Sequence, residues 1–441
     1  MTYEEAVKTI DSLLVFGSKP GLERVKELVE RIGAPDQQLK FVHVAGTNGK
    51  GSVCAYVSSI LKAAGYKTGL FISPYVLEFR ERFQINGEMI PYDTLAALVE
   101  EIYPVVLAMK DEGKIITEFE MVLAVALQWY AREQCDIVVL ETGLGGRFDA
   151  TNIIDTPLAS VIMSISLDHT AILGDTVEKI AFEKCGIIKE GGTTVLYGDQ
   201  PEGVLPVVQQ TAKERHNTLL IADTEPITLV SSGLEGSTFT LQSDIVTNGA
   251  AMTYTTPLIG AHQINNAAAA LYTVAALRQK GIMIPETAVQ QGLAQTKFPA
   301  RLELLQKEPV ILLDGAHNPG GAAALSKAIR EHLSGQRKVA VMGMLADKDV
   351  DTVLSQLAPL FDRVVTVAPP NPRAMTAADL AKRMAAYGIP AEAQEDYSAA
   401  FRKAKAYAAA YDPPAAIVIC GSLYMASEMR QTFMLCAEKG M

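Results

Sequence analysis

Two hydrophobic patterns alternate along the first half of this chain. Short apolar, β-branched runs without polar interruption are typical of strands that are covered on both faces. Such runs occupy residues 41–44, 69–72, 137–140 and 160–165. Between them lie segments with apolar residues at helical spacing, for example residues 52–64, which Gly65 would end. This order of elements predicts a parallel sheet with helices on its faces.

The pattern changes near residue 226. Residues 226–256 contain short alternating segments with Gly and Ser turns, which predict antiparallel strands at the edge of the first domain. A helix is expected over about residues 262–280. A second series of buried strands with intervening helices then occupies residues 310–313, 339–342, 364–367 and 416–420.

Chain length and this second series together predict two α/β domains. A chain of 441 residues exceeds the size at which a single core usually stops growing. We place the domains at residues 1–296 and 297–441, with the boundary near residues 295–301. We expect a mainly parallel sheet with a small antiparallel edge in the first domain and a Rossmann-like α/β fold in the second.

Composition and charge narrow the class of protein. The net charge of −11 argues against general binding to nucleic acid or to anionic membranes, which requires basic surface. The most apolar stretch, residues 121–131, is too short to span a bilayer, and the acidic N-terminus lacks the pattern of a signal peptide. Five scattered cysteines indicate reduced thiols rather than disulfides or a zinc site. We therefore expect a cytoplasmic enzyme, and we expect it to be a monomer.

A glycine-rich loop follows the first predicted strand. Its residues are Gly46, Thr47, Asn48, Gly49, Lys50, Gly51 and Ser52. Strand, loop and helix in this order are the context of a P-loop, in which backbone amides and a lysine bind nucleotide phosphates. The common pattern has glycine in place of Val44, and Ser or Thr in place of Gly51. A plain tight turn is the alternative. The sequence thus predicts a P-loop ATPase-like first domain with a variant loop.

This variant loop resembles that of the Mur ligase superfamily, and in particular of its folylpolyglutamate synthase and dihydrofolate synthase branch. Other segments resemble signatures of the same branch, in the same order along nearly the whole chain. They are residues 139–152 (VLETGLGGRFDATN), 167–170 (LDHT), 183–189 (EKCGIIK), 260–267 (GAHQINNA), 314–319 (DGAHNP) and 421–424 (GSLY).

Two positions depart from that resemblance. The branch often has Ser-Pro-His where this chain has Ser73-Pro74-Tyr75, and Pro-Gly-Arg where it has Pro299-Ala300-Arg301. We expect Ala300 to disfavour a positive φ that glycine accepts, and the approach of Arg301 to its ligand to differ slightly as a result.

The resemblance implies an ATP-dependent ligase that adds L-glutamate to a folate, with a tetrahydrofolate, dihydropteroate or both as the acceptor. A carboxylate resists nucleophiles, so it must first be activated. Attack of the carboxylate on the γ-phosphate gives an acyl phosphate and ADP, and the amine then displaces phosphate. Catalysis of this kind depends mainly on positioning and on cations.

Magnesium is the implied cofactor, with two ions expected. Ser73, Glu141 and His169 each follow a predicted strand, where open α/β sheets bind ligands, and the resemblance assigns all three to the metal. It also implies that Lys184 is carbamylated by carbon dioxide, which would make this lysine an anionic oxygen ligand. Without the resemblance, Lys184 would be interpreted as a solvated helix lysine, and a single His or Glu at a strand end is often structural.

The remaining candidate residues come mainly from the second half of the chain. Lys50, Lys184, Arg301 and His317 are the catalytic candidates. Arg301 would reach the β- or γ-phosphate, with an interdomain salt bridge as the alternative. The resemblance implies that Asp314 acts in a ribose or phosphate network and that His317 contacts phosphate or the incoming amino acid.

Polar side chains at the head of a helix complete the predicted nucleotide site. Gln263 and Asn266 would hold adenine or phosphate, although a helix-capping role is also open. Arg82, Arg147 and Ser422 are candidates for binding the folate carboxylates or glutamate, since these substrates are anionic and the whole chain is acidic.

Two other functions remain open. The first is a Mur-type ligase with a cell-wall or other peptide acceptor. Relatives of that kind usually carry a UDP-binding domain before the loop, whereas here the loop begins at residue 46, so a folate acceptor is expected. The second is a P-loop nucleotide switch, which would not need the segment from Asp314 to His317 or the metal lysine.

Overall fold

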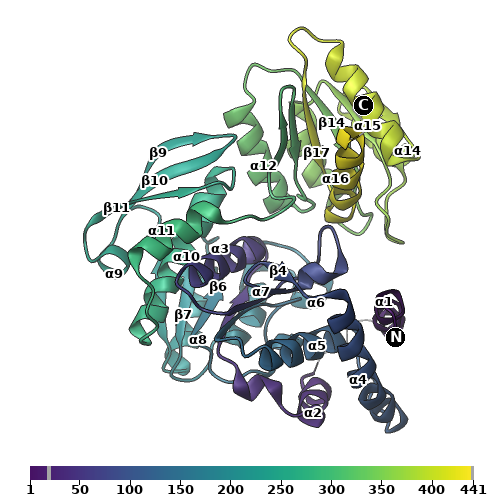
Figure 1. Ribbon diagram of the computed structural model, residues 1–441. Helices are drawn as coiled ribbons and strands as arrows, with labels where there is room; N and C mark the ends of the chain where they lie inside the picture. Colours follow the sequence, from purple (N-terminus) through teal and green to yellow (C-terminus); the bar gives the residue numbers. More distant parts are fainter. Residues whose placement is uncertain (17–20, 439–441) are drawn as a thin grey trace. The chain divides into compact units, whose positions relative to one another are not determined.

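The computed structural model describes residues 1–16 and 21–438 of the chain (Figure 1). The chain divides into two compact units, each assembled from three segments. The first unit comprises Met1–Thr228, Thr240–Tyr254 and Asn265–Thr296, and the second comprises Leu229–Phe239, Thr255–Ile264 and the residues from Lys297 onward.

The first unit is built on an eight-stranded sheet with the order β4-β3-β2-β5-β1-β6-β7-β8. Its strands are β1 (Phe41–Ala45), β2 (Thr68–Phe71), β3 (Phe83–Ile85), β4 (Glu88–Met89), β5 (Ile137–Glu141), β6 (Ala159–Ile162), β7 (Thr193–Tyr197) and β8 (Thr218–Ala222). The strands from β2 to β8 in this order are parallel, whereas β3 and β4 pair antiparallel at one edge. The prediction of a mainly parallel sheet with an antiparallel edge is confirmed, although residues 83–89 form that edge.

Helices connect these strands and cover the sheet (Figure 1). They are α1 (Tyr3–Asp11), α2 (Glu23–Arg31), α3 (Lys50–Ala63), α4 (Tyr92–Asp111), α5 (Glu118–Arg132), α6 (Thr170–Leu173), α7 (Val177–Lys184), α8 (Val204–Glu214), α9 (Asp244–Thr247), α10 (Ala261–Gln279) and α11 (Glu286–Gln295). Single 3₁₀ turns occur at Ser12–Phe16, Pro35–Gln38, Phe79–Arg82, Ala150–Ile153 and Cys185–Ile187.

Helix α5 shows how the core of this unit forms. Thr117 and Glu120 make a reciprocal capping box that starts the helix. The stretch Met121–Leu127 is completely buried in the main hydrophobic cluster together with residues from α1, α2 and α4. An apolar helix of this length is therefore a core element, and none of the described helices is long and apolar enough to cross a membrane.

The second unit contains a six-stranded sheet with the order β12-β13-β17-β14-β15-β16. Its strands are β12 (Glu303–Lys307), β13 (Val310–Leu313), β14 (Lys338–Met342), β15 (Arg363–Thr366), β16 (Ala391–Ala393) and β17 (Ala416–Cys420). All pairs are parallel except β12 with β13. The helices are α12 (Pro319–His332), α13 (Val350–Leu357), α14 (Ala377–Ala386), α15 (Tyr397–Ala409) and α16 (Leu423–Glu438), with a 3₁₀ turn at Ala358–Leu360. This arrangement is the expected second α/β fold.

The region of alternating pattern forms a three-stranded sheet of its own with the order β11-β10-β9. Its strands are β9 (Ile227–Gly233), β10 (Gly236–Gln242) and β11 (Ala251–Thr256). The hydroxyl of Thr238 contacts that of Thr255, and the hydroxyl of Thr240 contacts that of Thr253. This reversed order is that of an antiparallel pair, as the pattern predicted.

A buried hydrogen-bonded chain begins on β1, next to the phosphate loop. The Thr151 hydroxyl donates to the Asp149 carboxylate, so the Thr151 oxygen accepts a hydrogen bond from Nε2 of His43 at 2.8 Å. His43 has no exposed surface. Burial, with a smaller contribution from the charge of Lys189, lowers the pKa of His43 to about 3. The histidine is therefore neutral in the folded protein near neutral pH.

This burial predicts a specific loss of stability in acid. Unfolded His43 would bind a proton below about pH 6.5, whereas folded His43 binds one only near pH 3, so lowering the pH between these values favours unfolding. The loss amounts to at most about 1.4 kcal/mol per pH unit. His43→Gln keeps a donor to Thr151 but does not titrate. Denaturant unfolding at several pH values should give a shallower acid slope for the variant, and equal slopes would contradict the prediction.

Candidate active site

The phosphate loop is held by the segment that follows β6. Loop residues Thr47 and Asn48 donate their backbone amides to the carbonyl of Ser164, at 2.8 and 3.2 Å. The Thr47 hydroxyl also donates to the carbonyl of Ser166 at 3.1 Å. Helix α3 begins at Lys50, and Gly49 before it adopts φ +84°, which L side chains rarely adopt. These contacts define the path of the loop from β1 into the helix.

Two glycines of this loop have no space for a side chain. A Cβ atom at Gly46 would lie 2.6 Å from Cβ of Met163, and one at Gly49 would lie 2.8 Å from Oδ1 of Asn266. Asn266, on the first half of α10, therefore lies directly against the loop, and its contact with a nucleotide stays a prediction. Its side chain is buried, with 4% exposure.

Lys50, Glu141 and Ser73 meet beside the loop. The ammonium of Lys50 lies 3.7 Å from Oε1 of Glu141, and the backbone amide of Ser73 donates to Oε2 of Glu141 at 3.2 Å. The carboxylate is nearly buried and comes from the last residue of β5, while Ser73 follows β2. Adjacent parallel strands bring their carboxyl ends to one edge of the sheet, so the structure brings these predicted residues together.

His169 stands on the loop between β6 and α6. Its φ is +51°, its side chain is 44% exposed, and Nε2 lies 4.0 Å from Oδ1 of Asp168. In residues 1–16 and 21–438, no three His, Cys, Asp or Glu side chains form a group that could hold a metal ion. The assignment of His169 to the same metal as Ser73 and Glu141 stays a prediction.

Lys184, the last residue of α7, is buried beside the phosphate loop. Its amine donates to the carbonyl of Gly46 at 2.8 Å, and the residue is 3% exposed. Burial, followed by the charge of Lys50, lowers the pKa of Lys184 to about 7, against the opposing effect of Asp168 and Asp149. The interpretation as a solvated helix lysine is therefore wrong, because the side chain points inward to the loop.

The two arginines proposed to bind substrate are both engaged in ion pairs. Arg82 pairs with Glu118 at the start of α5, and its guanidinium lies 5.4 Å from the ring centre of Tyr75. Arg147 pairs with Glu183 at 2.6 Å and is stacked 4.4 Å from the ring centre of its neighbour Phe148. Sequence analysis identified neither Glu118 nor Glu183 as the partner of an arginine.

Asp314 and Arg301 lie close together in the second unit. The Asp314 carboxylate accepts from the amides of Leu302 and Ala316, both at 2.8 Å, and burial raises its pKa while Arg301 opposes that shift. A Cβ at Gly315 would lie 3.3 Å from Nη1 of Arg301. Ala300 adopts φ +52°, so the expected avoidance of a positive φ does not occur. This backbone is held in place because Gly315 donates its amide to the carbonyl of Ala300 at 3.0 Å.

His317 and Ser422 follow neighbouring parallel strands of the same sheet. Nδ1 of His317 donates to the carbonyl of Gly315 at 2.9 Å, which leaves Nε2 as the acceptor in the neutral ring. Ser422 follows β17 and is 1% exposed. Gln263 lies at the start of α10 within the second unit and is also buried. The contact of these three residues with any substrate stays a prediction.

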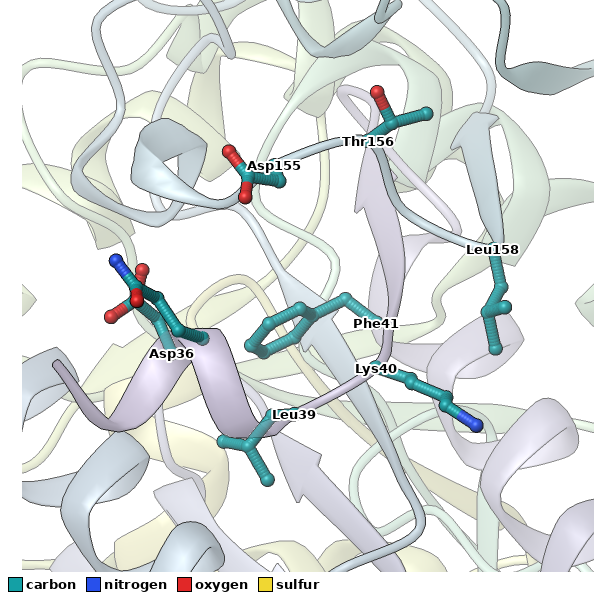
Figure 2. Close-up of a pocket in the computed structure, with 8 residues that line it drawn as sticks. Asp36, Leu39, Lys40, Phe41, Asp155, Thr156 and Leu158 are labelled. Atoms are coloured by element: carbon teal, nitrogen blue, oxygen red, sulfur yellow. The ribbon is translucent and has the colours of Figure 1, made fainter.

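A small pocket of about 120 Å³ lies at the opposite, amino ends of β1 and β6 (Figure 2). Its lining residues are Asp36, Gln37, Leu39, Lys40, Phe41, Asp155, Thr156 and Leu158. Open α/β sheets bind their ligands at the carboxyl ends of the strands. This pocket is therefore separate from the residues described above.

The tight packing of Gly49 gives a prediction with a matched control. Gly49→Ala would place a methyl group against Asn266 and would strain a positive φ, so it should lower nucleotide affinity by at least about tenfold, or ~1.4 kcal/mol. Gly65 has φ +91° and no atom within 4 Å, so Gly65→Ala has only the backbone cost of about 1–2 kcal/mol. Calorimetric titration of both variants with ATP should show weaker binding for Gly49→Ala alone. Equal affinities would contradict the role of this contact.

Comparison with known proteins agrees with this geometry. A family model of the Mur ligase middle domain matches residues 44–274, and a model of the Mur ligase, glutamate ligase domain matches residues 300–423. A dihydrofolate synthase/folylpolyglutamate synthase of Bacillus subtilis (strain 168) is 38% identical over 388 residues, which cover 86% of this chain and 88% of that protein.

Solved structures give the same result. The Mycobacterium tuberculosis folylpolyglutamate synthase complexed with ADP and AMPPCP has a TM-score of 0.87 at 31% identity, covering 98% of this chain and 99% of that one. The Escherichia coli FolC in complex with DHPP and ADP has a TM-score of 0.83 at 29% identity, covering 100% and 99%. The chain therefore belongs to the folylpolyglutamate synthase and dihydrofolate synthase branch of the Mur ligase superfamily, and it is an ATP-dependent ligase.

Proposed function

We propose that this chain joins L-glutamate to a folate with cleavage of ATP to ADP and phosphate, and that it accepts tetrahydrofolates, dihydropteroate or both. The observation that carries the proposal is the convergence of Lys50, Glu141 and Lys184 on the phosphate loop. The related structures hold ADP, AMPPCP and DHPP, which supports a nucleotide and a second small molecule as ligands here. We further propose that the enzyme acts as a monomer in the cytoplasm.

The first step needs positive charge around the transferred phosphate. A folate carboxylate oxygen attacks the γ-phosphorus, the bond to the bridging oxygen breaks, and ADP leaves with that electron pair. Lys50 supplies charge from the loop, and the start of α3 at Lys50 supplies further positive potential. We assign Arg301 to the β- or γ-phosphate, and its charge acts on the nearby carboxylate of Asp314.

Glu141 and Ser73 are suited to hold magnesium. Magnesium usually binds through one or two carboxylates together with substrate phosphates and water, and Glu141 presents one nearly buried carboxylate next to the loop lysine. His169 would complete this set. When bound, the ion would neutralise phosphate charge and orient the γ-phosphate for attack.

The burial of Lys184 is suited to carbamylation. A pKa of about 7 leaves a large share of the amine uncharged near neutral pH. Its nitrogen lone pair attacks the carbon of carbon dioxide, one C=O electron pair moves to oxygen, and the nitrogen releases a proton to solvent. The product is an anionic carbamate beside Lys50, which would hold the second magnesium ion, whereas an ammonium would not.

The second step joins the amine of glutamate to the acyl phosphate. The amine attacks the acyl carbon, and the tetrahedral intermediate expels phosphate. His317 and Ser422 are placed at the carboxyl ends of β13 and β17, and we assign them to the incoming glutamate. Arg82 and Arg147 would receive carboxylates of the folate or of glutamate, after these displace Glu118 and Glu183.

A coupled assay tests this function. Purified protein with ATP, magnesium and bicarbonate above pH 8 should release phosphate only when a folate and L-glutamate are both present. Dihydropteroate and a tetrahydrofolate are offered separately, and the mass of each product shows which acceptor is used and how many glutamates are added. Phosphate release that needs neither substrate would favour a nucleotide switch, and release with a peptide acceptor alone would favour another Mur-type ligase.

Two lysine substitutions test the site itself. Lys50→Ala removes charge at the transferred phosphate and should lower kcat by about 100- to 1,000-fold. Lys184→Ala removes the proposed carbamate and should lower kcat by about 10- to 100-fold. The matched control is Lys179→Ala on the same helix, where the lysine is exposed and pairs only with Asp175 in the described contacts. Steady-state rates that are unchanged in Lys184→Ala would refute the carbamate.

A further inference from the structure

The loop after β5 and the end of α7 touch backbone to backbone. A Cβ at Gly146 would lie 2.8 Å from the carbonyl oxygen of Lys184, and a Cβ at Gly186 would lie 2.2 Å from Cα of Arg147. The Arg147 amide also donates to the carbonyl of Glu183 at 2.7 Å. The close backbone contact therefore fixes the position of these two segments relative to each other, and Lys184 lies at this contact.

One side chain joins both segments. Nδ2 of Asn152 donates to the carbonyl of Arg147 on the loop and to the carbonyl of Gly186 beyond the helix, both at 3.1 Å. Because both partners are carbonyl oxygens, they accept only, and the orientation of the amide group is determined. Asn152 is 6% exposed, so its two hydrogen bonds do not compete freely with water.

A second contact involves the backbone of Asn152. The amine of Lys189 donates to the backbone carbonyl of Asn152 at 3.1 Å. Lys189 lies five positions after Lys184 in the same segment. Asn152 thus holds this segment at two positions, at Gly186 through its side chain and at Lys189 through its backbone.

These contacts have a direct consequence for the active site. Lys184 reaches the carbonyl of Gly46 in the phosphate loop at 2.8 Å. A shift of the end of α7 by about one ångström is enough to break such a hydrogen bond. The position of the lysine amine is therefore set by the residues that fix the end of this helix.

We infer that Asn152 is a positioning residue for catalysis, which holds the end of α7 so that Lys184 projects onto the phosphate loop. The inference rests on the proposed role of Lys184 as a carbamate. Asn152 itself touches neither nucleotide nor acceptor in this assignment. Its loss should therefore lower kcat and leave the KM values for ATP and folate nearly unchanged.

The test uses paired asparagine variants of the full chain. Asn152→Asp replaces both donors with an oxygen that faces two carbonyl oxygens, and Asn152→Ala removes the donors without adding charge. The matched control is Asn217→Asp, because Nδ2 of Asn217 also donates to a backbone carbonyl of this segment, that of Lys189 at 2.8 Å, at its far end. Thermal unfolding of each variant shows that it is folded before its kinetics are compared.

The expected result is a loss of about 10- to 100-fold in kcat for both Asn152 variants, as for residues that support a metal ligand, and little change for Asn217→Asp. A double-mutant cycle adds Lys184→Ala. If Asn152 acts through Lys184, Asn152→Ala should have almost no further effect in the Lys184→Ala background. A readout without turnover comes from metal-free protein with ¹³C-labelled bicarbonate, in which the Lys184 carbamate signal should be weaker in the Asn152 variants.

The outcomes distinguish the positioning role of Asn152 from the proposed carbamate of Lys184. Normal kcat in the Asn152 variants together with an impaired Lys184→Ala would overturn the role of Asn152 alone, as would additive losses in the cycle. Normal turnover in Lys184→Ala and no carbamate signal in the wild-type protein would overturn the proposed carbamate, and with it the need to position this lysine.

Discussion

The amine of Lys184 lies buried against the carbonyl of Gly46, and this contact requires three separate parts of the chain to meet. Helix α7 must end there, the loop after β5 must pack on that end, and the phosphate loop must turn toward it. A charged lysine is seldom buried without a partner. The surroundings of this amine must therefore supply hydrogen-bond acceptors or favour its chemical modification. The parallel sheet supplies the framework, since the carboxyl ends of β1, β5 and β6 lie side by side.

The second unit follows the same physical rule with different residues. Parallel strands β13 and β17 end next to each other and place Asp314 and Ser422 at one edge. Buried Asp314 accepts two backbone amides, and the charge of Arg301 acts on the same carboxylate. Each unit thus has a buried carboxylate near a lysine or arginine, and phosphoryl transfer depends on such cations.

Much of the fold could be predicted from the hydrophobic pattern, because buried strands leave a clear signal. Predicted residues 310–313 and 416–420 match β13 and β17 in full. The prediction of residues 160–165 extended three positions past the end of β6, since Met163 and Ile165 are still buried. There the carbonyl of Ser164 turns to the phosphate loop instead of a neighbouring strand, and periodicity carries no information about such a partner.

The site could be predicted only in part. Motifs identified Lys50, Glu141 and Ser73, which the structure brings together, but not the partners of Arg82 and Arg147. Glu118 and Glu183 are far from these arginines in sequence and belong to helices whose pattern reports burial rather than charge pairing. Asn152 was part of a recognised segment, yet both of its hydrogen-bond acceptors are backbone carbonyls. Because every residue type has a carbonyl, the sequence does not indicate these partners.

The conformation of Ala300 shows that a sequence pattern can exclude residues that the structure accepts. This alanine adopts a φ of +52°, at a cost of about 1–2 kcal/mol, because the amide of Gly315 donates to its carbonyl and the carboxylate of Asp314 accepts from the amide of Leu302. The surrounding hydrogen bonds determine the turn, and the residue at position 300 adopts the conformation that they impose. Relatives with alanine at this position should therefore keep the same turn before their arginine, and a search pattern that demands glycine would overlook them.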